Sequence, residues 1–270
     1  MDKSIKECIK SRRSVRTYDG KQLSEEDKLK LNECAKEADN PFGVPVEFRF
    51  LEAKDHNLTS PVIVGCDYYV AIKASRNSSQ WEIACGYSFE KFCLDALKSD
   101  FGTVILAGTF SRDTFEQAME LKEDEVMPVA SPVGRIADKM SIREKLMRKG
   151  VGADKRLPFE DIFFDESFDK GLTPERAGKF YEALEMVRLA PSAVNKQPWR
   201  VVVCGDSVHF YEKHNKSLEN ELGDIQKIDM GIALAHFDLT LKEEGYSGTF
   251  VAEKPNINDD SLEYIITYKL

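Results

Sequence analysis

An internal repeat is the feature that most constrains how this chain can fold, because each copy must form the same unit. In the first copy, Ser24 is a good helix N-cap, and Asp27 three residues later can complete a capping box. The predicted helix breaks at residues 40–43, which read Asn-Pro-Phe-Gly. Residues 48–51 then form an extended apolar run, which predicts a strand.

The second copy follows the same order. Thr173 is the predicted N-cap, and Pro174 sits at the first helical position, where its missing N–H costs nothing. This helix breaks at residues 190–192, and the strand 199–203 follows. The repeat therefore predicts a helix, a turn and a strand in each half.

A second pair of segments agrees with the first. Residues 86–97 and residues 231–241 both read as buried helices that are apolar nearly all round. The spacings from glycine to phenylalanine and from glycine to leucine match: Gly86, Phe92 and Leu94 against Gly231, Phe237 and Leu239. We predict that a strand at residues 103–106 follows the first of these helices.

These repeats predict two tandem α+β halves, each with a sheet and a central helix. The acidic stretch 159–172 is the expected junction, so the halves are placed at residues 1–160 and 161–270. With 42% hydrophobic residues, the chain can bury a large core.

The charge balance limits the partners of the chain. Its 38 Lys and Arg against 47 Asp and Glu give a net charge of −9, and such a surface repels nucleic-acid phosphates and anionic lipids. The charged N-terminus lacks the apolar core of a secretory signal, and no apolar run could span a bilayer. We expect a cytoplasmic protein without nucleic-acid or membrane partners, whose six cysteines are buried or free thiols.

Any anionic ligand must then be held by a local basic cluster. The strongest cluster is Arg12, Arg13, Ser14 and Arg16, directly after a predicted short helix at residues 5–9. Arginine presents a rigid fork of donors that suits phosphate and the carbonyl edge of a planar ring. Basic N-terminal runs are often only solvated, so the cluster gains meaning from the motifs that accompany it.

The loop between the second helix and its strand carries further polar groups. It contains Pro191, Ser192, Asn195 and Gln197, whereas the matching turn of the first copy lacks the Asn-x-Gln pair. Two weaker signals add to it. The sequence Leu106-Ala107-Gly108 follows a predicted strand, where glycine would let a flat ligand approach the backbone. Arg156 is a candidate phosphate contact after the basic stretch 139–149, which otherwise reads as a solvated helix face.

Together these motifs resemble the nitroreductase family of FMN enzymes, and in particular a branch with a duplicated fold in one chain. The N-terminal cluster is similar to the family's R-[RH]-S-x-[RK] motif, and residues 191–199 to its P-S-x-x-N-x-Q-P-W motif. The resemblance implies an intramolecular pseudo-dimer with antiparallel or mixed sheets and a flavin between the halves. It implies phosphate and ribityl contacts for the first motif, and ring contacts for the second.

The two weaker motifs, at residues 106–108 and at Arg156, also resemble elements of the family, and the first differs from the family pattern at one residue. The resemblance implies a backbone amide near flavin N5 at Leu106-Ala107-Gly108, but Ala107 replaces the usual acidic residue, so only a backbone role remains. Arg156 begins an R-x-P element that implies a phosphate contact. The acidic residues 163–169 stand where a second basic cluster would be needed. We therefore expect one FMN per chain and a monomer.

The resemblance implies an FMN-dependent oxidoreductase in which NAD(P)H reduces the flavin and a nitroaromatic, quinone or flavin-like acceptor reoxidises it by a ping-pong hydride mechanism. No catalytic side chain and no metal site is predicted, since a flavin carries the redox chemistry itself. A non-enzymatic FMN-binding or storage protein is an alternative, as are dehalogenation and enone reduction. The sequence leaves the acceptor and the choice between NADH and NADPH open.

Overall fold

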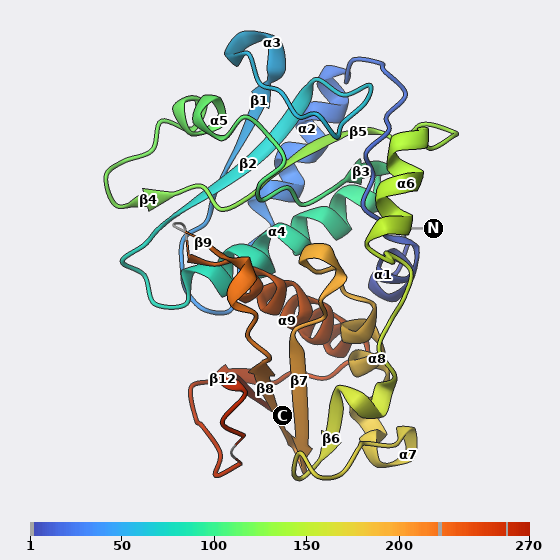
Figure 1. Ribbon diagram of the computed structural model, residues 1–270, viewed down its shortest axis with the longest axis vertical. Coiled ribbons are helices and arrows are strands. Elements are labelled where there is room, and N and C mark those ends of the chain that lie inside the picture. The colour runs from blue at the N-terminus through green and yellow to red at the C-terminus, as the bar shows by residue number, and fades with distance from the viewer. Residues whose placement is uncertain (1–2, 221–222, 258) are drawn as a thin grey trace.

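The computed structural model describes residues 3–220, 223–257 and 259–270. Two α+β halves stack along the long axis of the molecule, with α4 and α9 between them (Figure 1). The elements of the first half are α1 (Ile5–Ser11), α2 (Glu25–Lys36), β1 (Glu47–Glu52), α3 (Ala53–His56), β2 (Tyr68–Ser75), α4 (Trp81–Lys98), β3 (Phe101–Thr103), α5 (Arg112–Met119), β4 (Glu125–Val126), β5 (Ala130–Arg135) and α6 (Ile142–Gly150). Those that follow are η1 (Phe159–Asp161), β6 (Phe163–Asp165), α7 (Pro174–Ala177), η2 (Gly178–Phe180), α8 (Tyr181–Leu189), η3 (Ala193–Asn195), β7 (Trp199–Cys204), β8 (Ser207–Glu212), η4 (Lys216–Leu218), β9 (Glu219–Asn220), β10 (Gly223–Asp224), α9 (Ile225–Glu243), β11 (Thr249–Val251) and β12 (Glu263–Lys269).

The helix starts follow their capping residues. Ser24 and Asp27 form the predicted capping box of α2, in which each side chain bonds the other residue's backbone amide. Thr173 caps α7 as predicted. The single helix predicted from Thr173 is wrong, because Gly178 has a φ of +51° that interrupts the helical path. The long apolar segment of this half is therefore α8, which begins at Tyr181.

The two sheets are organised differently. The first has the order β1-β2-β5-β3, with β4 paired to the other end of β2, and all of its pairs are antiparallel. The second has the order β11-β12-β8-β7-β6 and is mixed, because β6 runs parallel to β7. β6 begins shortly after the predicted junction at residue 160, so the second sheet takes its edge strand from that stretch.

One strand prediction needs correction. The strand predicted at residues 103–106 is displaced toward the N-terminus, and β3 covers Phe101–Thr103. Asp100 adopts a φ of +60°, so the chain leaves α4 abruptly and pairs at once with β5. Leu106 makes only an isolated bridge to Ala130. Residues 131–134 lie inside β5.

The two central helices cross at their matched glycines. A Cβ atom on Gly86 would lie 2.0 Å from the carbonyl oxygen of Ile228, and one on Gly231 would lie 2.1 Å from that of Ile83. No side chain fits at such distances, so each glycine admits the backbone of the opposite helix. The reciprocal contacts give the crossing a local twofold character and confirm that the two glycines are counterparts.

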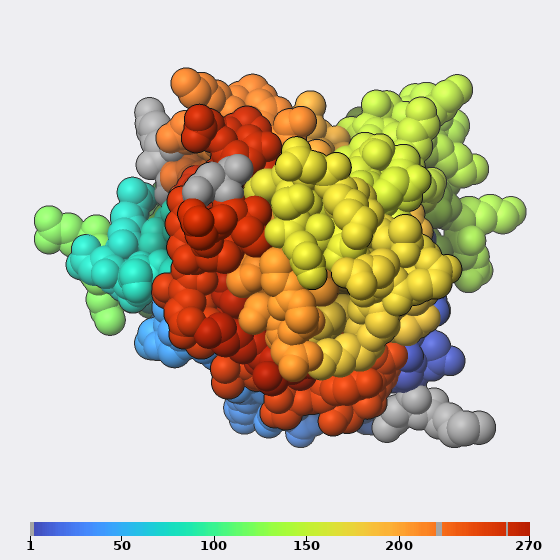
Figure 2. All heavy atoms as spheres, turned by 90° about the horizontal axis from the view of Figure 1, so that it is seen from below, coloured from blue at the N-terminus to red at the C-terminus, as the bar shows by residue number. Residues whose placement is uncertain are grey.

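A continuous apolar core joins the halves. One cluster contains residues of both sheets and both central helices, including Phe92 of α4, Phe237 of α9 and Trp199 of β7. From below, the visible face is formed mainly by residues of the second half, and the first half appears at its margins (Figure 2). The six cysteines are free thiols. Within the described residues, no helix has the length and apolarity needed to cross a bilayer.

We predict that Gly86→Ala and Gly231→Ala each lower the free energy of unfolding by about 3 kcal/mol, because the helices must move apart to admit the methyl group. Gly150→Ala is the matched control, since it is also a helical glycine but nothing lies within 4 Å of its added Cβ. Urea unfolding measures all three. Equal stability of Gly86→Ala and the control would contradict the close crossing.

Candidate functional site

An open groove of about 530 Å³ runs along the junction of the halves. Four stretches of chain line it: the end of α1 with the residues after it, the segment after β3, α6 with its following turn, and the loop after α8. In Figure 1, α1, α6 and α8 lie on the same side of the molecule. The groove collects every predicted site residue except Gln197, namely Arg12, Arg13, Ser14, Arg16, Leu106, Ala107, Gly108, Arg156, Pro191, Ser192 and Asn195.

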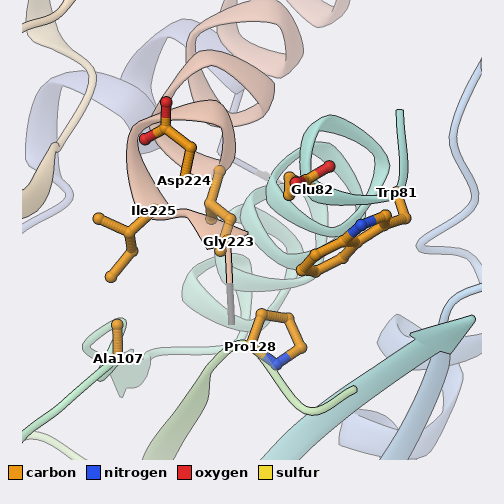
Figure 3. A pocket seen from close by; sticks show the side chains of 8 residues that line it. Trp81, Glu82, Ala107, Pro128, Gly223, Asp224 and Ile225 are labelled. Carbon is orange, nitrogen blue, oxygen red and sulfur yellow. The ribbon is translucent and has the colours of Figure 1, made fainter. Parts of the chain in front are cut away.

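A deeper cavity of about 120 Å³ shares Arg12, Arg16 and Ala107 with this groove. It extends to Asp229 and to apolar side chains of α9. A small pocket lies beyond it and shares Ala107, Ile225 and Ile228 with the cavity. Figure 3 shows Ala107 and Ile225 on one side of that pocket and Trp81 on the other. The shared residues form one recess with a basic outer part and an apolar inner part.

Arg12 belongs to a buried network between the halves. Its Nε lies 2.8 Å from Oε1 of Glu90 on α4, and both side chains are almost fully buried. The same oxygen lies 2.9 Å from Nε2 of His236 on α9, while Nδ1 of His236 contacts the carbonyl of Met186. His236 is thus a hydrogen-bonded core residue. Nη2 of Arg12 has no hydrogen-bond partner within the described residues.

Arg13 is held by a residue that the sequence analysis missed. Glu144 of α6 is fully buried and forms an ion pair with Arg13. Its carboxylate also accepts hydrogen bonds from Thr17 Oγ1 at 2.7 Å and from the backbone amide of Arg16 at 3.2 Å. The basic stretch was expected to be a solvated helix face, but one side of α6 fixes the arginine cluster. The sequence signal was Ser141, which caps α6 by accepting the amide of Glu144.

Arg16 and Arg156 are the arginines of the groove with no acidic partner among the described ion pairs. Burial lowers the pKa of both guanidinium groups from its usual value. Arg156 donates to the carbonyls of Ala153 and Leu189, and its Nε has no partner within the described residues; the same holds for Nε of Arg16. Buried donors without acceptors are unfavourable, so these two side chains indicate an anionic ligand.

The loop after α8 has unusual backbone geometry. Val194, Asn195 and Gln197 have φ values of 43°, 58° and 50°. Left-handed geometry is rare for a β-branched residue such as Val194, whose side chain is 53% exposed and lines the groove. Such conformations gather at functional sites because the surrounding contacts must enforce them.

Asn195 and Gln197 supply those contacts. Asn195 Nδ2 donates to the carbonyls of Gly152 and Lys155, and Gln197 Oε1 accepts the amide of Leu157 at 2.9 Å. Gln197 is buried and lies outside the groove lining, so the structure gives it a positioning role. The backbone amide of Gln197 donates to Ser192 Oγ at 2.8 Å, and this bond joins the two ends of the loop.

Asp229 is a second residue that the sequence analysis missed. It lies in α9, is buried, and accepts the amide of Ala193 at 2.9 Å with one oxygen and at 3.1 Å with the other. Burial raises the pKa of this carboxyl well above its usual value, and the nearby Glu212 and Asp224 add to the effect. An acid directly before the apolar run 230–235 of α9 was the signal available in the sequence.

The segment 106–108 offers backbone rather than side chains. The backbone of Leu106 is paired with Ala130, and its side chain packs in a separate apolar cluster. A Cβ atom added to Gly108 would have no other atom within 4 Å, so the groove beside this residue is open. Within the described residues, the backbone amides of Ala107 and Gly108 have no hydrogen-bond partner. Both N–H groups are therefore free to donate to a ligand.

The matching loop of the first half is filled instead of open. Phe42 packs against Tyr87 and Phe250, with ring centroids 5.9 and 5.5 Å away. Asn40 donates to the carbonyl of Val44 and to Ser88, which fixes the turn internally. The corresponding basic cluster is absent, because the acidic stretch expected there forms β6 and its turn.

A family model with the description "Putative TM nitroreductase" matches residues 4–241. Among solved structures, the chain is similar to a protein from Thermotoga maritima described as "a putative nitroreductase". The two share 19% identity and a TM-score of 0.63, over 99% of this chain and 93% of that chain. This likeness confirms the predicted fold over the whole length.

Shorter proteins match about half of the chain. One from Bacteroides thetaiotaomicron, described as "Putative NADH dehydrogenase/NAD(P)H nitroreductase", has 20% identity and a TM-score of 0.43, over 51% of this chain and 89% of its own. An "FMN-dependent Nitroreductase" from Clostridium difficile has 14% identity and a TM-score of 0.40, over 53% and 94%. No curated protein matches the chain.

We predict that Asp229 makes stability fall as pH rises. Between the usual pKa of an aspartate and its raised value here, the folded chain keeps a proton that the unfolded chain has released. The slope should reach about 1.4 kcal/mol per pH unit in that window. Asp229→Asn removes the titration but keeps an acceptor for Ala193, so urea unfolding should show a weaker pH dependence.

The exposed Asp55→Asn is the matched control and should unfold with the wild-type pH dependence. If Asp229→Asn and wild type lose stability equally between about pH 5 and pH 8, the buried carboxyl is not held protonated.

Proposed function

The chain belongs to the family described as "Putative TM nitroreductase", and on that premise we propose that it is an FMN-dependent oxidoreductase. In this proposal NAD(P)H reduces the bound flavin, and a nitroaromatic, quinone or flavin-like acceptor then reoxidises it. The observation that carries the proposal is the set of buried guanidinium donors without partners, on Arg12, Arg16 and Arg156, along one groove.

The residues present fit a flavin nucleotide. The outer groove offers arginines for a phosphate, and the inner cavity is lined by small or apolar side chains, among them Ile105, Ala107 and Ile228. A planar ring needs apolar faces and a few polar contacts at its edge. Arg16 lines both parts, so it can reach the edge of a ring placed inward of the phosphate.

When bound, FMN would supply the hydride chemistry, which no side chain of the groove can provide. The positively charged guanidinium of Arg16, fixed in place and partly buried, would stabilise negative charge on the ring. The free amides at Ala107 and Gly108 would orient the ring through backbone donors that need no reorganisation. Asp229 holds the loop at Ala193, which would place this loop over the inner face of a bound ring.

The test is anaerobic titration of the purified, FMN-loaded protein with NADH and, separately, NADPH. Bleaching of the flavin by either nucleotide, followed by recovery on adding a quinone or a nitroaromatic, is the expected result. Flavin released by denaturation should amount to one FMN per chain, because Phe42 fills the second loop. A flavin that neither nucleotide bleaches indicates a binding or storage protein, and two flavins per chain contradict the single site.

We predict that Arg16→Ala and Arg156→Ala each weaken FMN binding by about 10- to 100-fold, because a charged hydrogen bond contributes about 1.5–3 kcal/mol. These two are preferred over Arg12 and Arg13, whose removal would leave Glu90 or Glu144 buried without its cation. Isothermal titration of the flavin-free protein measures the affinity.

Arg49→Ala is the matched control, because Arg49 lies on β1, pairs with Glu120 and is not among the residues that line the groove. Unchanged FMN affinity in both groove variants would refute the anion assignment. Circular dichroism of each variant shows whether the fold is retained.

A further inference from the structure

A compact ligand cluster lies at the start of α9, outside the groove. It consists of Glu212 at the end of β8, His214 two residues later, and Asp224 directly before α9. Nδ1 of His214 lies 3.3 Å from Oε1 of Glu212 and 2.9 Å from Oδ2 of Asp224. One ligand atom from each residue lies within 4.8 Å of the others.

Glu212 provides a second and independent observation. Its side chain is 0% exposed, although a carboxylate is among the most costly groups to bury. Its Oε2 has no hydrogen-bond partner within the described residues. Glu212 therefore faces a histidine with one oxygen and has no donor or cation among the described residues at the other. Burying a carboxylate in this way costs free energy unless a further ligand binds it.

We propose that Glu212, His214 and Asp224 bind one transition-metal dication of the Zn²⁺ class. Zinc bonds to nitrogen and oxygen are about 2.0–2.2 Å, so tetrahedral ligands lie roughly 3.3 Å apart. The 3.3 Å separation between His214 and Glu212 matches that spacing, and the 2.9 Å separation between His214 and Asp224 is about 0.4 Å shorter. An imidazole nitrogen with two carboxylates favours Zn²⁺ over Ca²⁺ or Mg²⁺, which prefer larger sets of oxygen ligands.

The surroundings also suit a metal. If Nδ1 of His214 is the ligand, its Nε2 remains free to donate, and Oε2 of Glu219 lies 3.7 Å from it. A carboxylate beside the second ring nitrogen is the usual support for a metal-bound histidine. His214 is 29% exposed and Asp224 is 10% exposed, so a water molecule can complete the coordination.

The proposed site would be structural. Oδ1 of Asp224 caps α9 through the amide of Gln226, so a metal on Oδ2 would join the end of β8 to the start of that helix. In Figure 3 the carboxylate of Asp224 points away from Ala107 and Pro128, the groove side of the small pocket. The metal would therefore lie behind the pocket wall and not beside a bound flavin.

The experiment is titration of chelator-treated, full-length protein with Zn²⁺ in competition with a chromogenic chelator. We expect one Zn²⁺ per chain and a higher unfolding temperature with the metal. Glu212→Gln and His214→Gln should each weaken binding at least about 10-fold, because loss of even a residue that only supports a metal ligand costs roughly 10–100-fold in affinity. His56→Gln, which changes an exposed histidine of α3, is the matched control and should bind like wild type.

Substitution with Co²⁺ separates this site from the free cysteines. Visible d–d bands without thiolate charge-transfer bands are expected for nitrogen and oxygen ligands. Equal Zn²⁺ affinity in wild type and both cluster variants, or Co²⁺ spectra dominated by thiolate bands, would overturn the proposal. Near-UV circular dichroism establishes that the variants are folded, and flavin binding is measured separately, so failure here leaves the proposed reductase activity untouched.

Discussion

The backbone contact between α4 and α9 sets the distance between the two halves of the molecule. Gly86 and Gly231 let the carbonyls of Ile228 and Ile83 approach to distances that exclude any side chain. Each sheet then covers the outer side of one central helix, and the core runs through both. The groove lies at the edge of this crossing, where α1, α6 and the loop after α8 meet. Its width therefore depends on how closely the two helices pack.

The crossing is symmetric, but the charges around it are not. Glu90 lies four residues after Gly86, and the position four residues after Gly231 is Ala235. The position in α9 that corresponds to Glu90 therefore offers no carboxylate that could hold an arginine. Arg12 lies on the Glu90 side of the crossing, with His236 on the far side of Glu90. On the other side, Phe42 packs against Tyr87 and Phe250, and Asn40 donates hydrogen bonds to Val44 and Ser88. The duplication thus kept one geometry and gave its two ends different chemistry.

The sequence predicted what local patterns determine. Helix caps at Ser24 and Thr173, the paired glycines and the grouping of basic and loop motifs were all visible along the chain. Contacts between distant segments were not. Glu144 contacts Arg13 across 131 residues of sequence, and Asp229 contacts Ala193 across 36 residues. β3 is displaced because Asp100 adopts a left-handed backbone conformation. An aspartate does not require that conformation, so the sequence did not predict it. Gln197 was predicted to line the site because it belongs to the loop motif, but it lies outside the groove lining and positions the loop. A motif alone does not distinguish these two roles.

The shared core has a consequence for how the site responds to dilution. In an assembly of separate subunits, the contact across the groove would follow mass action, and its occupancy would depend on protein concentration. Here both walls belong to one covalent chain, joined through residues 151–162, so their encounter is unimolecular. A local effective concentration set by that connection replaces the bulk concentration. The integrity of the groove is therefore independent of how much protein the cell contains.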